Sequence, residues 1–506
     1  MVYGIRIAQR GRKAKTRRMR AVILALVLVG LAVRAVAARE FTVLVYNVEN
    51  LFDVDGVAAY EQFRQAPDGD YGVGPLLVKL ENIRQTLAAF GESGPEVILF
   101  QEFELDRTPF ETPRAEDFLR ETRGRSLEQL LTRERGFESL PAELLLLKHL
   151  DDHGMGGYQI AQPDPFRSES HPAHKNVVFS RFPIEFTRQR PSHDARDLLV
   201  VGLNVEGRRL IVLNNHWKSG ASSAETEPTR VQNARVVRAE LDAILLEDPD
   251  ADVLIGGDLN CYYNHSASFP RLAVTGINDI LGADGNEARM LEEDSRHLYN
   301  LWFEVPAAER GSEVWQGYWG TLMQIILTPG LYDREGIQYV DNSFGRLVLA
   351  GKNVDSRWGR PLSWTNYGGG SGFSDHLPIY ARFRVVEADE AGPMSVDRPT
   401  NEAFSAERPR VELERFERRT VPPATVLGAL SPAERAERMG ELFLVEGTLV
   451  GSRPARLRFG DLELEVYSPV RELRDRLGRL QAGQTVRFFA DLGDWRGQLQ
   501  FVIRDP

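Results

Sequence analysis

The sequence predicts an α/β (α+β) fold, a four-layer sandwich of two β-sheets flanked by helices, followed by a small C-terminal β-barrel. Two observations support this fold class. Across residues 41–385, apolar strand-like runs alternate with segments of helical periodicity, as expected when surface helices cover sheets. Residues 436–506 read as three strands, a helix and two further strands, an order typical of small closed barrels. A chain of 506 residues is long enough for two or three such domains.

The first 38 residues predict a secretory signal peptide. Many basic residues lie in positions 1–20, an apolar run follows over 21–33, and Ala35-Val36-Ala37 forms a small-x-small cleavage site. The competing interpretation is a transmembrane anchor, but the run is shorter than the usual ~20 residues and Arg34 interrupts it. We therefore expect a secreted or periplasmic protein without stable membrane association after cleavage. Its oligomeric state is left open.

The charge of the remaining chain is strongly acidic. Residues 1–38 hold nine of the 62 basic residues and none of the 73 acidic ones, so cleavage leaves a net charge near −20. This charge opposes indiscriminate binding of polyanions. A phosphodiester substrate remains compatible, because a bound divalent cation makes a site locally positive. The single cysteine, Cys261, excludes an intramolecular disulfide.

Four apolar runs end in carboxylate, amide or histidine side chains, and a fifth cluster of this kind precedes a strand. The runs over 41–46 and 97–100 lead into Asn47-Val-Glu49 and Gln101-Glu102. Those over 208–213 and 251–255 lead into Asn214-Asn-His216-Trp-Lys218 and Gly256-Gly-Asp258-Leu-Asn260. Ser374-Asp375-His376 precedes the strand-like run 377–383. Strand alternation predicts Asp258 and Asn260 on one face, and the two glycines permit a close backbone approach or an unusual turn.

The remaining periodic segments fill in the predicted sandwich. Helices are expected at 80–90, 127–150 and 230–246, and further strands at 176–184, 198–205, 298–305 and 322–328. The charged stretch 103–150 reads as a helical insertion that caps one edge of the domain spanning 39–385. Histidines 149, 153, 171, 174 and 193 are scattered over polar segments and carry no functional signal.

These motifs, in this order, resemble the endonuclease/exonuclease/phosphatase superfamily, which has the deoxyribonuclease-I-like fold. The resemblance implies a metal-dependent phosphodiester hydrolase that uses Mg²⁺, with Mn²⁺ or Ca²⁺ as alternatives. It implies Glu49, Glu102 and Asp375 as metal ligands, and Asn47, Asn176 and Lys218 as phosphate contacts. It also implies His216, Asp258, Asn260 and His376 as the catalytic group, with Asp258 as general base or water-orienting carboxylate. Oxygen ligands of this kind suit a hard cation that keeps several waters.

One position departs from the family pattern. The family usually carries an aspartate on a late strand that orients the terminal histidine, and Met323 stands at the matching position here. Gln324 is next to it, but strand alternation directs its side chain to the opposite face. In a related triad, loss of the orienting acid costs orders of magnitude in rate. Either another group reaches His376, or catalysis is slower, or the fold serves a different substrate.

The C-terminal part reads as a linker over 386–435 and a domain over 436–506 that resembles an OB-fold. Such barrels often bind single-stranded nucleic acid through aromatic and basic side chains, for which Arg487, Phe489, Trp495 and Arg496 are candidates. The region has eleven basic and eleven acidic residues, so a purely packing role is the stronger alternative.

The leading hypothesis is a secreted Mg²⁺-dependent phosphodiesterase, a nuclease that hydrolyses DNA or RNA through attack by metal-activated water. One alternative is a phosphoesterase on phospholipid or inositol head groups, which uses the same core chemistry. Another is a catalytically weakened binding protein, suggested by Met323.

Overall fold

The computed structural model describes residues 40–64, 71–108, 112–168, 173–221, 223–292, 295–315, 317–355, 359–364, 372–386, 421–459, 462–468, 471–495 and 498–503. The predicted signal peptide and residues 387–420 of the predicted linker lie outside these ranges. Among the described helices, none has the length and apolar character needed to span a bilayer.

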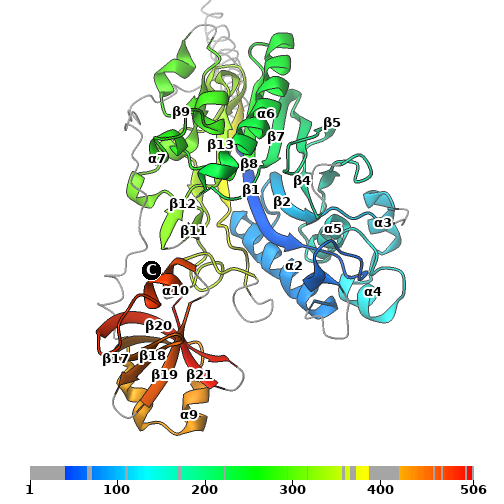
Figure 1. The fold of residues 1–506 in the computed structure, drawn as a ribbon. Coiled ribbons are helices and arrows are strands. Elements are labelled where there is room, and N and C mark those ends of the chain that lie inside the picture. The colour runs from blue at the N-terminus through cyan, green and yellow to red at the C-terminus, as the bar shows by residue number, and fades with distance from the viewer. Residues whose placement is uncertain are drawn as a thin grey trace, which may run out of the picture.

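Two seven-stranded sheets form the centre of the N-terminal domain (Figure 1). The first has the order β14 (Gly336–Tyr339), β16 (Ile379–Val386), β1 (Glu40–Leu51), β2 (Val97–Glu104), β4 (His174–Ser180), β3 (Gln159–Ala161), and β15 (Gly345–Arg346) pairs with β16. The second has the order β5 (Ile184–Arg190), β6 (Leu198–Val205), β7 (Arg208–His216), β8 (Asp252–Asp258), β13 (Met323–Leu327), β10 (Leu298–Asn300), β9 (Ala283–Asp284).

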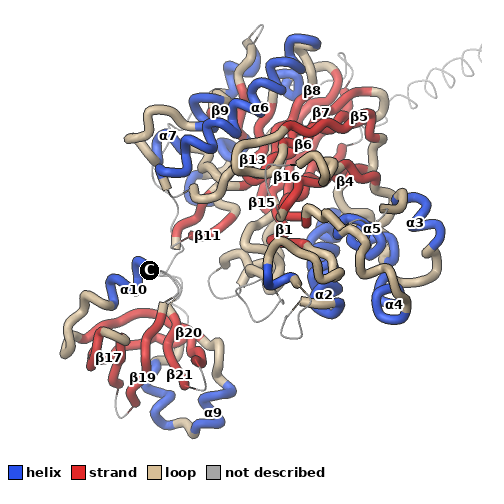
Figure 2. The backbone as a smooth tube through the Cα atoms, turned by 45° about the vertical axis from the view of Figure 1, so that its right-hand side comes forward, coloured by secondary structure: helices blue, strands red, loops and turns tan. Residues whose placement is uncertain are grey.

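The sheets pack face to face, and helices cover their outer faces (Figure 2). Apolar side chains from both sheets, among them Val43, Leu99, Val212 and Leu254, form one buried cluster. Helices α2 (Val73–Leu87), α3 (Ala115–Glu121), α4 (Leu127–Arg133) and α5 (Ala142–Asp152) share a second cluster with the first sheet. Helix α6 (Glu227–Glu247) shares a third with the second sheet. The four-layer α/β sandwich is therefore confirmed.

Three predicted elements are shorter than expected. The helix expected over 127–150 is two helices, because Gly136 has a φ of +90° and Pro141 precedes α5. The strand expected over 176–184 ends at Ser180, and the chain passes through Pro183 into β5 of the other sheet. The strand expected over 298–305 gives way after Asn300 to a 3₁₀ helix, Leu301–Glu304, whose Trp302 N–H donates to the Asn300 side chain at 3.0 Å.

The C-terminal domain is a closed barrel of five strands. Its order is β17 (Leu442–Ser452), β18 (Ala455–Phe459), β19 (Leu462–Tyr467), β21 (Gln498–Val502), β20 (Thr485–Trp495), and α10 (Arg471–Leu477) lies between β19 and β20 in sequence. The predicted barrel is thus present, while the OB assignment remains a prediction. Of the four candidate nucleic-acid contacts, Arg487 forms an ion pair with Glu446 at 3.8 Å, and the side chains of Trp495 and Arg496 lie outside the described part.

The predicted linker, 386–435, includes residues at its C-terminal end that belong to the barrel domain. Pro423 bridges to Leu444 of β17, and Ala424 and Leu427 are buried in the barrel core. These two apolar residues lie in one 3₁₀ helix (Ala424–Ala429). The neighbouring prolines led the sequence analysis to assign this segment to the linker. A short helix, α9 (Pro432–Glu437), follows. Residues 421–437 therefore belong to the barrel domain.

Candidate active site

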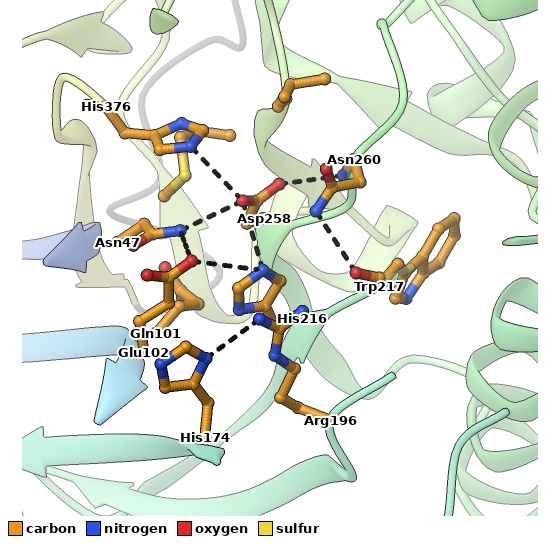
Figure 3. A network of polar contacts seen from close by, with 12 residues as sticks. Asn47, Gln101, Glu102, His174, Arg196, His216, Trp217, Asp258, Asn260 and His376 are labelled. Carbon is orange, nitrogen blue, oxygen red and sulfur yellow. Dashed lines mark hydrogen bonds and ion pairs between the residues drawn. The ribbon is translucent and has the colours of Figure 1, made fainter. Parts of the chain in front are cut away.

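The ends of strands from both sheets bring the predicted side chains together (Figure 3). The Asn47 amide links the two sheets: its Nδ2 donates to Glu102 Oε1 at 3.1 Å and to Asp258 Oδ2 at 3.1 Å. Asn47 and Glu102 come from the neighbouring strands β1 and β2, whereas Asp258 ends β8 of the opposite sheet. One amide therefore holds two carboxylates that are distant in sequence at the edge of the sandwich.

Two histidines lie beside the Asp258 carboxylate. His216 Nε2 is 3.5 Å from Asp258 Oδ2 and 3.8 Å from Glu102 Oε1. His376 Nε2 is 3.6 Å from Asp258 Oδ2 and 3.8 Å from Asp375 Oδ1. The parallel register of β7 and β8 pairs His216 with Asp258, and Ser374 Oγ fixes the other loop by donating to Asn47 O at 2.7 Å. Predicted residues Asn47, Glu102, His216, Asp258, Asp375 and His376 thus form one network.

Left-handed backbone segments set this geometry. Glu49, Asn50 and Glu102 have φ values of +52°, +67° and +66°, a region that residues with a Cβ rarely adopt. The register of β1 with β2 shifts between Asn47 and Leu51, so strand alternation fails at this point. The turn lets Asn50 N–H donate to Glu102 Oε2 at 3.1 Å. Backbone strain of this kind is concentrated at functional sites.

Asp258 and Asn260 are in contact, but not through the strand alternation that the sequence predicted. Strand β8 ends at Asp258, and Asn260 has a φ of +48°, so the period-2 argument does not apply. The two residues are instead joined directly, because Asn260 N–H donates to Asp258 Oδ1 at 2.9 Å. The Asn260 Nδ2 group donates to Trp217 O at 3.3 Å. Gly257 confirms the expected close approach: its φ is +135°, and a Cβ there would lie 2.0 Å from Asn215 O.

The site concentrates negative charge around one histidine. Burial opposes protonation of His376, but Asp375, Asp258, Glu313 and Glu102 together raise its pKa to about 9. The charges of Glu49, Glu102 and Asp258 raise the pKa of Asp375, against the lowering effect of His376. The Asp375 side chain is 52% exposed, so it lies at the solvent side of the network. A cation bound here would relieve the repulsion among these carboxylates.

Three residues predicted to bind metal or phosphate contact other parts of the protein: Glu49, Asn176 and Lys218. Both carboxylate oxygens of Glu49 accept hydrogen bonds at 2.6 Å, from Ser363 Oγ and Trp364 N–H, so Glu49 anchors that loop. Asn176 is fully buried and donates to Asp197 O and Asn214 O, which makes it an inter-strand tie rather than a phosphate contact. Lys218 Nζ pairs with Asp194 Oδ2 at 2.6 Å. Metal ligation by Glu49 and phosphate binding by Lys218 stay predictions.

Comparison with known proteins agrees with this arrangement. A model of the endonuclease/exonuclease/phosphatase family matches residues 173–385, the segment that contains His216, Asp258, Asn260, Asp375 and His376.

Solved structures with a similar fold cover most of the sandwich domain. TDP2 from Caenorhabditis elegans is 15% identical, with 69% of this chain and 75% of that chain covered and a TM-score of 0.37. Sphingomyelinase C from Streptomyces griseocarneus is 17% identical, with coverage of 68% and 99% and a TM-score of 0.35. A family protein from Bacteroides thetaiotaomicron is 13% identical, with coverage of 70% and 98% and a TM-score of 0.37. A search of curated proteins found no match.

The residues gathered at this site suit a divalent metal ion. Glu102 and Asp258 share one amide donor, and Asp375 lies within reach of the same histidine as Asp258. These ligand atoms are carboxylate oxygens, which hard cations prefer. Glu49, Glu102 and Asp258 all place negative charge near Asp375. Glu102 and Asp375 are therefore the side chains that would hold the ion.

Another carboxylate reaches His376 where the family's aspartate is missing. Met323 is buried and pairs with Asp258 across β13 and β8. Glu313, from the hairpin of β11 (Glu313–Trp315) and β12 (Tyr318–Gly320), has its Oε2 atom 4.0 Å from His376 Nδ1. The Glu313 carboxylate accepts hydrogen bonds from Ser312 Oγ at 2.5 Å and Leu322 N–H at 3.1 Å. The Glu313 carboxylate occupies the space that a side chain at position 320 would fill, since a Cβ on Gly320 would lie 1.8 Å from Glu313 Oε1.

Sequence reasoning missed two further polar groups beside the network. His174 is buried on β4, contrary to its expected place on a polar loop, and its Nε2 lies 2.8 Å from Asn50 Oδ1. Arg196 Nη2 lies 3.1 Å from His174 Nδ1 (Figure 3), and the Arg196 backbone N–H donates to His216 O at 3.2 Å. The only sequence signal was the position of His174 at the start of a strand. His149 was also misplaced, since it is buried on α5 with Nε2 3.3 Å from Glu81 Oε2.

Proposed function

We propose that this protein is a secreted, Mg²⁺-dependent phosphodiesterase that hydrolyses DNA or RNA. The observation that carries the proposal is the single network of Asn47, Glu102, His216, Asp258 and His376, built from the edges of both sheets. The family match supports metal-dependent phosphoester hydrolysis as the reaction class. The apolar run and small-x-small site over 21–37 support export.

In the proposed mechanism, Asp258 accepts the proton of the attacking water. Asn47 Nδ2 and Asn260 N–H bind one Asp258 oxygen each, so they orient the carboxylate for this step. His376 and His216 flank the same carboxylate and stabilise charge that develops on the phosphoryl oxygens. A metal ion held by Glu102 and Asp375 would supply additional charge neutralisation and would lower the pKa of bound water.

Glu313 takes the place of the family's late-strand aspartate in this scheme. It approaches His376 from the Nδ1 side, opposite the Nε2 atom that faces Asp258. Its carboxylate would fix the ring orientation and stabilise the histidine cation, which is how an orienting acid acts in related triads. This contact favours an active enzyme over a catalytically weakened binding protein.

The test is hydrolysis by mature protein of plasmid DNA, RNA and sphingomyelin vesicles, with and without EDTA. Nucleic acid is expected to be cleaved with Mg²⁺, and Asp258→Asn is expected to lower kcat by about 10²–10⁴-fold. The matched control is Asp164→Asn, since Asp164 is an exposed aspartate that also accepts a backbone N–H two residues on. Cleavage that survives both EDTA and Asp258→Asn would exclude the mechanism. Hydrolysis of sphingomyelin in preference to nucleic acid would favour the lipid head-group alternative.

A further inference from the structure

A second group of carboxylates lies outside the network described above. One carboxylate oxygen from each of Asp53, Asp55 and Asp106 lies within 4.8 Å of the other two. Glu104 adjoins them: its Oε2 accepts Asp53 N–H at 2.9 Å, and its charge acts on Asp53. Four acidic side chains therefore converge on the segments that follow β1 and β2.

The buried Asp53 carboxylate has an oxygen that needs a partner. The residue is only 3% exposed, and its Oδ2 has no hydrogen-bond partner within the described ranges. The other oxygen, Oδ1, accepts Asp55 N–H at 3.0 Å, which leaves Oδ2 as the atom able to bind a cation. A buried carboxylate oxygen without a partner is costly, unless an ion or water satisfies it.

A basic side chain near this charge is already engaged elsewhere. Among the described residues, Lys175 acts on the charge of Glu104, but its ammonium pairs with Glu143 at 2.9 Å and Gln162 at 2.7 Å. Burial and the neighbouring Glu104 charge raise the pKa of Asp53, as expected for an acidic cluster that lacks its counter-ion.

We propose that Asp53, Asp55 and Asp106 form a Ca²⁺ site, distinct from the catalytic metal site, that joins the segments after β1 and β2. One oxygen each of Asp55 and Asp106 accepts a nearby backbone N–H, from Val57 and Thr108, and this holds the carboxylates in place. Asp55 and Asp106 are partly exposed, so solvent can complete the coordination. Ca²⁺ fits better than Mg²⁺, because it accepts several carboxylates in flexible geometry, whereas Mg²⁺ usually takes only one or two.

The site has a consequence for the catalytic residues. Asp53 and Asp106 each lie four residues after Glu49 and Glu102, respectively. The ion would therefore stabilise the left-handed turns at Glu49, Asn50 and Glu102 from their C-terminal side. It would share no ligand with the Asp258 network.

Calorimetric titration of chelator-treated mature protein with CaCl₂ tests this proposal without any activity readout. It is done on Glu102→Gln protein, in which the catalytic metal site is impaired. We expect one Ca²⁺ per chain, with a Kd of about 10⁻⁵–10⁻⁴ M, and a rise in Tm of at least about 2 °C at saturation. The same background with Asp53→Asn and Asp106→Asn should show at least tenfold weaker binding. Asp164→Asn serves as the matched control and should bind as the parent does.

Thermal unfolding in EDTA separates loss of the site from loss of the fold. Without metal, the Asp53→Asn/Asp106→Asn protein should melt above its parent, because repulsion among the carboxylates is removed. With Ca²⁺ the order should reverse. Equal Ca²⁺ binding by both proteins, or no binding by the parent, overturns the proposal. Binding of Mg²⁺ in preference to Ca²⁺ overturns the calcium assignment. Failure of nucleic acid cleavage would bear only on the catalytic site.

Discussion

At the residue scale, His376 shows how one missing side chain is replaced from another element. Met323 removes the carboxylate that the family places on the late strand, and Glu313 approaches Nδ1 from the β11–β12 hairpin. Hydrogen bonds link the start of the hairpin to the start of β13. Ser312 Oγ accepts Met323 N–H at 3.2 Å, and Glu313 Oε2 accepts Leu322 N–H. The hairpin and β13 thus meet where the aspartate would have stood.

Removal of the Glu313 charge should slow catalysis without unfolding the protein. Glu313→Gln keeps the size of the side chain, and we expect kcat to fall about 10–10³-fold with KM nearly unchanged, since the group acts on His376 and not on substrate. Steady-state kinetics and a melting curve measure the two effects.

A second substitution distinguishes an orienting role from a structural one. Met323→Asp in the Glu313→Gln protein places a carboxylate at the family's usual position and should recover at least part of kcat. Full activity of Glu313→Gln alone would show that His376 does not need this partner. A drop in Tm that matches the loss of activity would assign Glu313 to packing.

At the element scale, strand ends were predictable and the turns that follow them were not. Apolar runs located β1, β2, β7 and β8 to within a few residues, and hence Asn47, Glu102, His216 and Asp258. The positive φ angles at Glu49, Glu102 and Asn260 have no counterpart in a period-2 pattern, because these turns form hydrogen bonds with residues distant in sequence. Glu313 was missed for a similar reason, since its three-residue strand is too short to give a periodic signal.

Gly257 is the position where an element depends most on the absence of a side chain. Its φ of +135° and the 2.0 Å approach to Asn215 O exclude a Cβ, so Gly257→Ala must displace β8 from β7. We expect a loss of about 3 kcal/mol or more in the free energy of unfolding, measured by urea denaturation. Gly207→Ala is the comparison, because its φ is also positive but nothing lies within 4 Å of the added Cβ. Similar losses in both variants would show that strain alone, and not the close approach, makes glycine necessary.

At the scale of the whole molecule, buried carboxylates make stability depend on pH. Asp252, at the start of β8, is 9% exposed and accepts Ile337 N–H at 2.9 Å. Burial, with the charges of Asp333 and Asp248, raises its pKa to about 8. A group with a raised pKa in the folded state stabilises fully below its unfolded pKa, and this contribution is lost as pH rises through the folded value. The relevant window therefore runs from about pH 4 to about pH 8.

Asp252→Asn should remove this pH dependence. The variant should be more stable than the parent by about 1–3 kcal/mol above pH 8, and the difference should shrink toward pH 5. Urea unfolding at pH 5, 6.5 and 8.5 measures it, with Asp164→Asn as the exposed control. A difference that stays constant across this range would mean that Asp252 is ionised in both states.

The two domains have separate cores, which predicts independent folding. The barrel cluster contains only residues between 424 and 503, and the sandwich clusters contain only residues between 41 and 383. A fragment of residues 421–506 should therefore unfold cooperatively on its own. A fragment that begins at 436 should be less stable, because it loses buried Ala424 and Leu427.

The fragment 39–390 keeps every proposed catalytic residue and should retain kcat within about twofold of the intact chain. If the barrel binds nucleic acid, its removal should raise KM for long single strands and leave KM for dinucleotides unchanged. Loss of kcat on both substrates would instead mean that the barrel supports the catalytic domain itself.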